Sequence, residues 1–192
     1  LIEENPLRAI KTNIIGTANV LQGSSEANVK GFIHVSTDKA AEPINLLGIT
    51  KKISELISRQ YSKNTNMKVG IVRFGNVFDS YGSVSELFRH NILNNKKINI
   101  SNPNVERFFM SKLEATNFLI TSLNLLLKHK YKKQSKIYIY DMGKPIKIIE
   151  LAKKMIFLSG RDISKYINKK FYGLDKKEKI SESLMGKNEK II

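Results

Sequence analysis

Residues 5 to 73 alternate between helical and extended patterns that are joined by short loops. Apolar residues recur at helical spacing from Asn5 to Gln22 and again from about Asn45 to Ser62. A β-branched run follows each of them, Gly31 to Ser36 and Lys68 to Arg73, and such runs are typical of buried strands. Helices and strands that alternate with short connections favour parallel strands and right-handed crossovers. The sequence therefore predicts an α/β fold with a doubly wound parallel sheet.

The apolar positions also predict which side chains form the core. The first helix is expected to bury Leu7, Ile10, Ile14, Ile15, Ala18 and Leu21. The second is expected to bury Ile49, Ile53, Leu56 and Ile57. Further helices are predicted at residues 84–94, 113–130 and 146–158, and extended segments at 97–100, 105–110 and 135–140. After Gly160 the chain becomes rich in lysine and loses its periodicity.

The composition excludes several kinds of site. The chain has no cysteine, which excludes disulfides and thiolate metal sites, and its three histidines, His34, His90 and His129, lack ligand spacing, so no metal site is predicted. No run of eighteen apolar residues is present, so we expect no membrane segment in this chain and a cytoplasmic location. Membrane anchoring of a longer parent protein stays open.

The net charge of +16 raises the question of nucleic acid. The lysines are spread along the whole chain, without an arginine-rich run or a basic stripe interleaved with aromatic residues. We therefore expect no dedicated nucleic-acid site. The positive charge would instead raise the local concentration of an anionic nucleotide substrate.

Polar side chains gather where the first predicted strand ends. Thr37, Asp38 and Lys39 follow the strand directly, and Lys51 lies on the first turns of the next helix. In open parallel sheets, ligands bind just beyond the carboxyl ends of the strands, so this stretch is a candidate active site. The alternative is that these residues only cap the helix and that both lysines are solvated.

The same stretch resembles a known family. The string Ser-Thr-Asp-Lys-Ala at residues 36–40, followed by Pro43, Asn45, Gly48, Thr50 and Lys51, is similar to the signature of CapD-like nucleotide-sugar 4,6-dehydratases of polysaccharide biosynthesis. These belong to the extended short-chain dehydrogenase/reductase superfamily. Further segments resemble the family's motifs over residues 3 to 184: residues 5–13, 73–77, 107–110 and 141–145.

The resemblance implies a fold, a reaction and a cofactor. The fold would be part of a Rossmann-like sheet with a small C-terminal substrate-binding part. The activity would be that of a lyase, which converts UDP-N-acetylglucosamine to a 4-keto-6-deoxy sugar through transient reduction of NAD, with NAD favoured over NADP. We expect residues 1–80 to be half of the NAD-binding and catalytic domain, 81–184 a mixed region with substrate-binding segments, and 185–192 a tail. A homo-oligomer is expected at full length.

The resemblance also assigns roles to the residues at the strand end. Lys39 would be the base at sugar C5, Asp38 the acid at C6, and Thr37 the partner of the sugar 4-hydroxyl, close to the cofactor. Lys51 would hold the nicotinamide ribose. A lysine base must be neutral, so its pKa must be lowered by desolvation or by nearby positive charge. The acid must stay protonated, which burial would favour.

Four further residues would bind the substrate by the same resemblance. Asn76 and Ser83 would lie near the phosphates or the sugar, Arg107 would meet the diphosphate, and Glu178 would grip the nucleotide. A guanidinium fork suits two phosphate oxygens. The alternative for Arg107 is an ordinary surface ion pair.

Three departures from the family pattern keep other interpretations open. Leu47 occupies the position of a tyrosine or methionine, and Asp175 stands where arginine is expected. No G-x-G-x-x-G loop is present, and the chain opens on Leu1, so we expect a fragment without the amino-terminal cofactor loop. The alternatives are a catalytically impaired nucleotide-sugar-binding remnant and a related NAD-dependent sugar epimerase.

Overall fold

A computed structural model describes residues 2–128, 133–168 and 171–190 and divides the chain into two compact units. Unit 1 comprises Leu1–Phe74, Ala115–Asp141 and Ser183–Ile192, and unit 2 comprises Gly75–Glu114 and Met142–Glu182. The chain thus passes between the units four times. The boundaries that we expected near residues 80 and 184 stay predictions.

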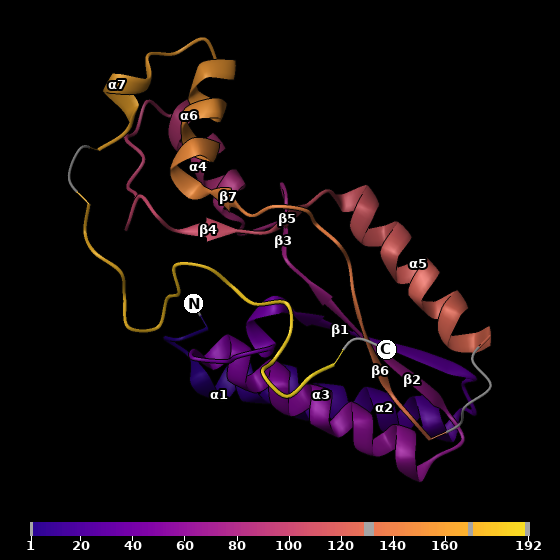
Figure 1. The fold of residues 1–192 in the computed structure, drawn as a ribbon. Helices are drawn as coiled ribbons and strands as arrows, with labels where there is room; N and C mark the ends of the chain where they lie inside the picture. Colours follow the sequence, from indigo (N-terminus) through magenta and orange to yellow (C-terminus); the bar gives the residue numbers. More distant parts are fainter. Residues whose placement is uncertain (1, 129–132, 169–170, 191–192) are drawn as a thin grey trace. The chain divides into compact units, whose positions relative to one another are not determined.

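The core of unit 1 is a parallel sheet in the order β1-β2-β6 (Figure 1). Its strands are β1 (Gly31–Thr37), β2 (Lys68–Phe74) and β6 (Lys136–Ile139). The register pairs Gly31 with Lys68 and Thr37 with Phe74, so β1 and β2 end side by side. The predicted α/β fold with a doubly wound parallel sheet is confirmed.

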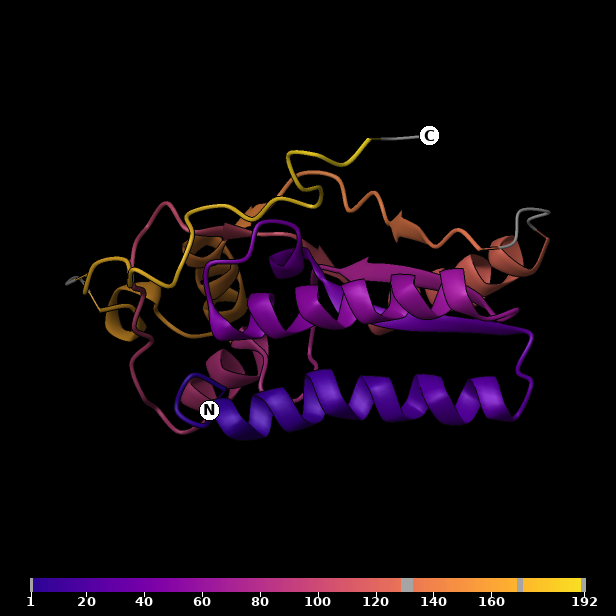
Figure 2. The ribbon, with the colours of Figure 1, turned by 90° about the horizontal axis from the view of Figure 1, so that it is seen from below.

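Helices lie on both faces of this sheet. One helical run consists of α1 (Pro6–Ile10), a π-helical turn η1 (Lys11–Ile15) and α2 (Gly16–Glu26), and it packs on α3 (Leu46–Asn64) (Figure 2). α5 (Lys112–Lys128) covers the other face. Gly70 of β2 lies against Leu126 of α5, whereas Arg73, three residues later, reaches Glu55 of α3. Because side chains alternate along a strand, these two contacts mark opposite faces.

The predicted burial of α3 is wrong for three of its four residues. Ile49, Ile53 and Leu56 are 44%, 38% and 54% exposed, and only Ile57 packs against an apolar cluster. The side of α3 that is buried instead carries mostly small or polar residues: Gly48, Thr50, Ser54, Glu55, Ser58 and Ser62. These side chains tolerate burial because β1 and β2 present polar partners to them, namely Ser36, His34 and Arg73.

The first helical run follows its predicted pattern only in part. Leu21 is fully buried beside Met67 and Val69, whereas Leu7 and Ile15 are largely exposed. The first helical run and α3 each begin at an asparagine cap. The Asn5 carboxamide oxygen accepts a hydrogen bond from Arg8 N, and that of Asn45 accepts one from Gly48 N.

Unit 2 is built from short elements around an apolar cluster. Its helices are α4 (Val84–Leu93), α6 (Ile148–Leu158) and α7 (Ile163–Tyr166). Two small ladders pair β3 (Asn76–Val77) with β5 (Phe109–Met110), and β4 (Glu106–Arg107) with β7 (Ile146–Lys147). The cluster joins α4 and α6 through Phe88, Ile92, Ile98, Ile100, Ala152 and Ile156.

The expected strand at residues 97–100 is reduced to one bridge, between Ile98 and Ile167. Ile98 N donates to Tyr166 O, and Ile98 O accepts from Asn168 N, so two bonds to a neighbouring loop satisfy the backbone there. The last two residues of the helix predicted at 113–130 lie outside the described residues. In the described part of the chain, no helix combines the length and the apolar run that would span a bilayer.

Candidate active site

Thr37, Asp38 and Lys39 lie together at the carboxyl end of β1. The strand stops at Thr37, and the next three residues form a single 3-10 turn, η2 (Asp38–Ala40). The Thr37 hydroxyl accepts a hydrogen bond from Lys39 N at 3.4 Å and donates to Asp38 Oδ1 at 2.9 Å. The backbone bond from Ala41 N to Asp38 O closes the turn at its end. The sequence pattern thus places three polar side chains on one tight turn.

The two carboxylate oxygens of Asp38 have different surroundings. Its side chain is fully buried, and Oδ1 accepts hydrogen bonds from Thr37 Oγ1, Lys39 N at 2.8 Å and Lys39 Nζ at 3.0 Å. Oδ2 is buried without a hydrogen-bond partner among the described residues. A buried polar atom without a partner is costly unless a ligand supplies one. Oδ2 therefore keeps an unused capacity to accept a hydrogen bond.

Lys51 reaches the same strand from α3. Its ammonium donates a hydrogen bond of 2.6 Å to Val35 O, two residues before Thr37. Burial lowers the pKa of Lys51, and the charge of Glu55 opposes that shift only in part. A cation is thus held near the end of β1, where it could meet the hydroxyls of a bound nucleotide.

The start of α3 is packed tightly onto the turn. A Cβ atom at Gly48 would lie 2.5 Å from Lys39 O and 3.1 Å from Pro43 Cβ, so only glycine fits at this contact. Leu47, the position at which the family resemblance expects tyrosine or methionine, is half-buried beside it. Its aliphatic side chain cannot transfer a proton.

Three of the four predicted substrate residues line one hollow in unit 2. This hollow has a volume of about 260 Å³, and its polar lining includes Asn76, Ser101, Asn102, Arg107 and Glu178. Arg107 is buried at its edge and donates to Glu106 O at 2.7 Å, Ile180 O at 3.1 Å and Glu178 Oε1 at 3.3 Å. The guanidinium is therefore not part of a solvated surface pair, and it already holds a carboxylate that an anionic ligand would have to replace.

Ser83 does not line this hollow. Its hydroxyl caps α4 by accepting from Glu86 N at 3.2 Å, and it lies 3.0 Å from Ser85 Oγ. Asp175, which occupies a position where the resemblance expects arginine, forms a turn by accepting hydrogen bonds from Lys177 N and Glu178 N. These two side chains shape the unit locally.

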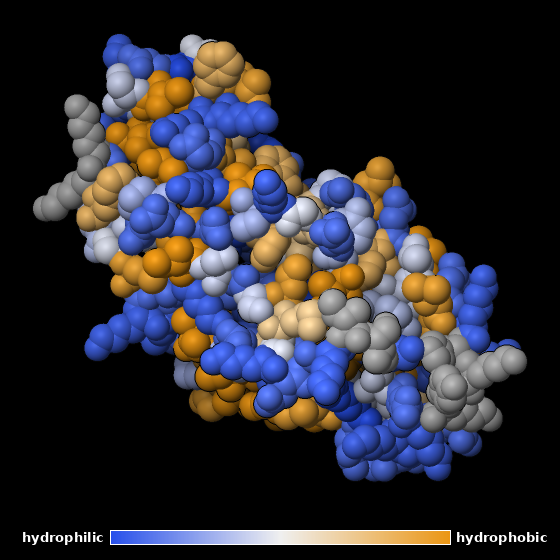
Figure 3. All heavy atoms as spheres, viewed as in Figure 1, coloured by the Kyte–Doolittle hydropathy of each residue, from blue (hydrophilic) through white to orange (hydrophobic). Residues whose placement is uncertain are grey.

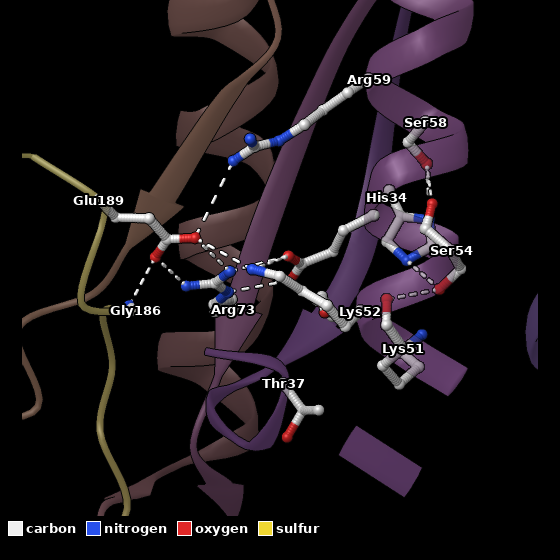
Figure 4. Close-up of polar contacts among 12 residues, drawn as sticks. His34, Thr37, Lys51, Lys52, Ser54, Ser58, Arg59, Arg73, Gly186 and Glu189 are labelled. Carbon is white, nitrogen blue, oxygen red and sulfur yellow. Dashed lines mark hydrogen bonds and ion pairs between the residues drawn. The ribbon is translucent and has the colours of Figure 1, made fainter. Parts of the chain in front are cut away.

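Sequence reasoning missed a buried ionic cluster in unit 1. Arg73, fully buried on β2, binds the carboxylates of Glu55 and Glu189 (Figure 4). The available signal was the presence of an arginine and a histidine inside the apolar runs of two strands. A larger hollow of about 620 Å³ runs along β6 and is lined by Arg59 and residues of the C-terminal segment, but by none of the predicted site residues.

Comparison with known proteins identifies the family. Residues 1–192 match the family described as polysaccharide biosynthesis protein. The chain belongs to this family. One similar protein is the capsular polysaccharide biosynthesis protein CapD of Staphylococcus aureus. It is 38% identical over 190 residues, which are 98% of this chain and 31% of CapD.

Two further proteins are similar to this polysaccharide biosynthesis chain. A UDP-glucose 4-epimerase of Rickettsia bellii (strain OSU 85-389) is 34% identical over 189 residues, 96% of this chain and 52% of the epimerase. The crystal structure of Pen from Bacillus thuringiensis superimposes with a TM-score of 0.79 at 31% identity, covering 96% of this chain and 55% of Pen. The chain thus spans about half of these two proteins and less than a third of CapD.

Proposed function

We propose that this chain carries the acid–base and sugar-binding residues of an NAD-dependent nucleotide-sugar 4,6-dehydratase. The substrate would be UDP-N-acetylglucosamine, and the product a 4-keto-6-deoxy sugar for polysaccharide synthesis. The observation that carries the proposal is the contact between Asp38 and Lys39 at the end of β1, with one buried oxygen of Asp38 left without a partner. Membership of a polysaccharide biosynthesis family supports the same assignment.

The proposed reaction needs an acid and a base next to each other. A bound nicotinamide nucleotide would supply reversible hydride transfer, from sugar C4 and back to C6. The proton of the C4 hydroxyl would pass through the Thr37 hydroxyl to Asp38, its hydrogen-bond partner, and so restore the acid. The 4-ketone acidifies the proton on C5, which the amine of Lys39 removes, while Asp38 gives its proton to the departing C6 hydroxyl. Lys39 later returns a proton to C5, so that water is the only molecule lost.

Thr37 and Lys51 fit the nicotinamide end of the cofactor. The Thr37 hydroxyl lies at the strand end, and the Lys51 ammonium lies within one hydrogen bond of the same strand. Ribose hydroxyls accept hydrogen bonds from an ammonium, and the cation would stabilise negative charge that develops on the sugar oxygen. The chain contains no glycine-rich phosphate loop, so these residues would hold only this end of the nucleotide.

Arg107 and Glu178 are proposed to hold the UDP part in unit 2. A diphosphate can take the place of Glu178 at the guanidinium, because bidentate binding of phosphate is a strong interaction of arginine. Glu178 would then be released to bind hydroxyl groups of the nucleotide. Asn76 lines the same hollow and is proposed as a further contact, and Ser83 would contribute from the N-terminus of α4.

The epimerase alternative is favoured by the Rickettsia relative and opposed by two residues, because epimerisation at C4 would give Asp38 and Lys39 no role. Leu47 cannot accept a proton and therefore weakens the oxidation at C4 that both reactions share. An impaired remnant that binds UDP-sugar without turnover is favoured by Leu47 and Asp175 together.

The experiment is product analysis with UDP-N-acetylglucosamine and NAD. The protein would be this chain, alone and joined to the amino-terminal part of CapD. We expect a product lighter than the substrate by one water, and Lys39→Ala should abolish it. Lys63→Ala, which changes an exposed lysine of α3, is the matched control and should retain activity. Undiminished product from Lys39→Ala would refute the assignment, and an isomer of unchanged mass would indicate an epimerase.

We also propose that a second copy of the chain covers the exposed stripe of α3. Ile49, Ile53 and Leu56 recur at helical spacing and stay exposed, and Figure 3 shows hydrophobic atoms at the surface over α1 as well. Leu56→Glu should therefore shift the protein to the monomer in light scattering after size exclusion. An unchanged mass would contradict a dimer through this face.

A further inference from the structure

The C-terminal segment, residues 183–190, is fastened to the sheet of unit 1 by Glu189 (Figure 4). Its Oε1 accepts from Arg73 Nη2 at 2.8 Å and from Lys52 Nζ at 3.3 Å, and its Oε2 accepts from Arg73 Nη1 at 2.5 Å. Burial opposes ionisation, but the hydrogen bonds from Arg73 and Gly186 N and the charges of Arg73 and Lys52 outweigh it and lower the pKa of Glu189 to about 2. Glu189 is therefore charged at neutral pH.

Arg73 connects this segment to α3. The same guanidinium that binds Glu189 also binds both oxygens of Glu55, at 2.9 Å and 2.8 Å, and Nη1 additionally donates to Leu184 O at 3.2 Å. One buried arginine thus holds two carboxylates and a backbone carbonyl. Removal of either carboxylate would leave a buried charge with half of its partners.

Two contacts carry the connection on to the turn of Asp38 and Lys39. Glu55 Oε1 accepts a hydrogen bond of 2.7 Å from Ser36 Oγ, and Ser36 is the residue before Thr37. At the other end of the turn, a Cβ atom at Gly186 would lie 2.9 Å from Ala41 O. The segment therefore supports the turn from both sides, through the ionic cluster before it and through backbone packing after it.

We infer that Glu189 and Gly186 are positioning residues for the candidate acid and base. This inference rests on the proposed function, because the dehydratase reaction is what gives Asp38 and Lys39 a chemical role. An acid and a base that must face adjacent sugar carbons tolerate little displacement. The C-terminal segment adds a second support to a turn that α3 already contacts at Gly48.

The first test measures hydrogen exchange of backbone amides and needs no substrate. Glu189→Gln weakens the ionic link, and Gly186→Ala pushes the segment off Ala41 without changing any charge. Both variants should speed exchange of the Lys39 and Ala41 amides by about tenfold or more, the effect of losing a hydrogen bond to a charged group. Amides of the ladder between β1 and β2 should keep their protection.

Lys187→Gln is the matched control, because Lys187 lies on the same segment with an exposed side chain, and it should leave exchange at the turn unchanged. Equal exchange at the turn in the wild type and both variants would overturn the inference. So would a uniform increase over all of unit 1, because it would show that the segment stabilises the unit as a whole.

The second test separates positioning from the chemistry itself. In the protein that turns over UDP-N-acetylglucosamine, both variants should lower kcat about tenfold or more and leave KM nearly unchanged, because neither residue is proposed to bind substrate. A rise in KM at unchanged kcat would contradict the inference. If the variants loosen the turn but the protein shows no turnover, residues 183–190 do hold the turn in place. That result would refute the dehydratase assignment instead.

Discussion

The stability of the protein should depend on pH through His34. This histidine of β1 is 5% exposed, and α3 places Ser58 Oγ 3.1 Å from its Nδ1 and Ser54 Oγ 3.4 Å from its Nε2 (Figure 4). Burial and the nearby charge of Lys51 lower the pKa of His34 from 6.5 to about 4, with Glu55 acting in the opposite direction. The folded protein therefore keeps this imidazole neutral.

The direction and size of the effect follow from this pKa. The unfolded chain takes up the proton near pH 6.5 and the folded chain only near pH 4, so the contribution of His34 is complete above pH 6.5. It is lost as the pH falls from 6.5 to about 4. At ~1.4 kcal/mol for each unit of pKa shift, the free energy of unfolding should fall by about 3 kcal/mol over this window.

The assay is urea unfolding followed by circular dichroism at pH steps from 7.5 to 4. His34→Asn keeps a polar group that can reach Ser58 but cannot titrate, so its unfolding free energy should be lower at pH 7.5 and should change less with pH. His90→Asn changes an exposed histidine of α4 and should keep the pH dependence of the wild type. Parallel curves for the wild type and His34→Asn would refute the reasoning, as would an NMR titration of His34 centred near pH 6.5.

Two further substitutions test the packing and the anion site. Gly48→Ala forces a methyl group against Lys39 O and should lower the free energy of unfolding by about 1–3 kcal/mol, or roughly 2–10 °C in Tm. The control Gly23→Ala has open space on α2 and should not destabilise the protein. Equal Tm values for the two variants in a thermal scan would contradict the close packing. Arg107→Lys removes the guanidinium fork and should weaken UDP binding about tenfold or more in calorimetry. The control Arg89→Lys changes the exposed ion pair with Asp79 and should not weaken binding. Equal affinities of the two variants would exclude the hollow in unit 2 as the diphosphate site.

The fold could be predicted from the sequence where local patterns decide it. The two β-branched strands, the asparagine caps and the apolar stripe of α6 are short-range signals, and the structure contains all of them. The orientation of α3 was not predictable in this way. Its apolar residues have helical spacing, yet polar partners on β1 and β2 draw the serine-rich side inward, and those partners lie far away in sequence.

The candidate site, too, was predictable only in its local part. Thr37, Asp38 and Lys39 are consecutive, so any turn at the strand end brings them together. The buried oxygen of Asp38 and the carboxylate that Arg107 already holds depend on the path of the chain around them and could not be seen in the sequence. The role of Glu189 was not predicted, because this residue lies in a lysine-rich stretch without periodicity, 116 residues from Arg73.

The most direct test of the central claim is the origin of the hydrogen at C5 of the product. Turnover of UDP-N-acetylglucosamine in deuterated water should place one deuterium at C5, because Lys39 exchanges its proton with solvent before it returns one to that carbon. Asp38→Asn should slow loss of the C6 hydroxyl, and Lys39→Ala should stop the exchange at C5. A 4-keto-6-deoxy product that retains its original C5 hydrogen, or deuterium at C5 without Lys39, would contradict the assignment of these two residues.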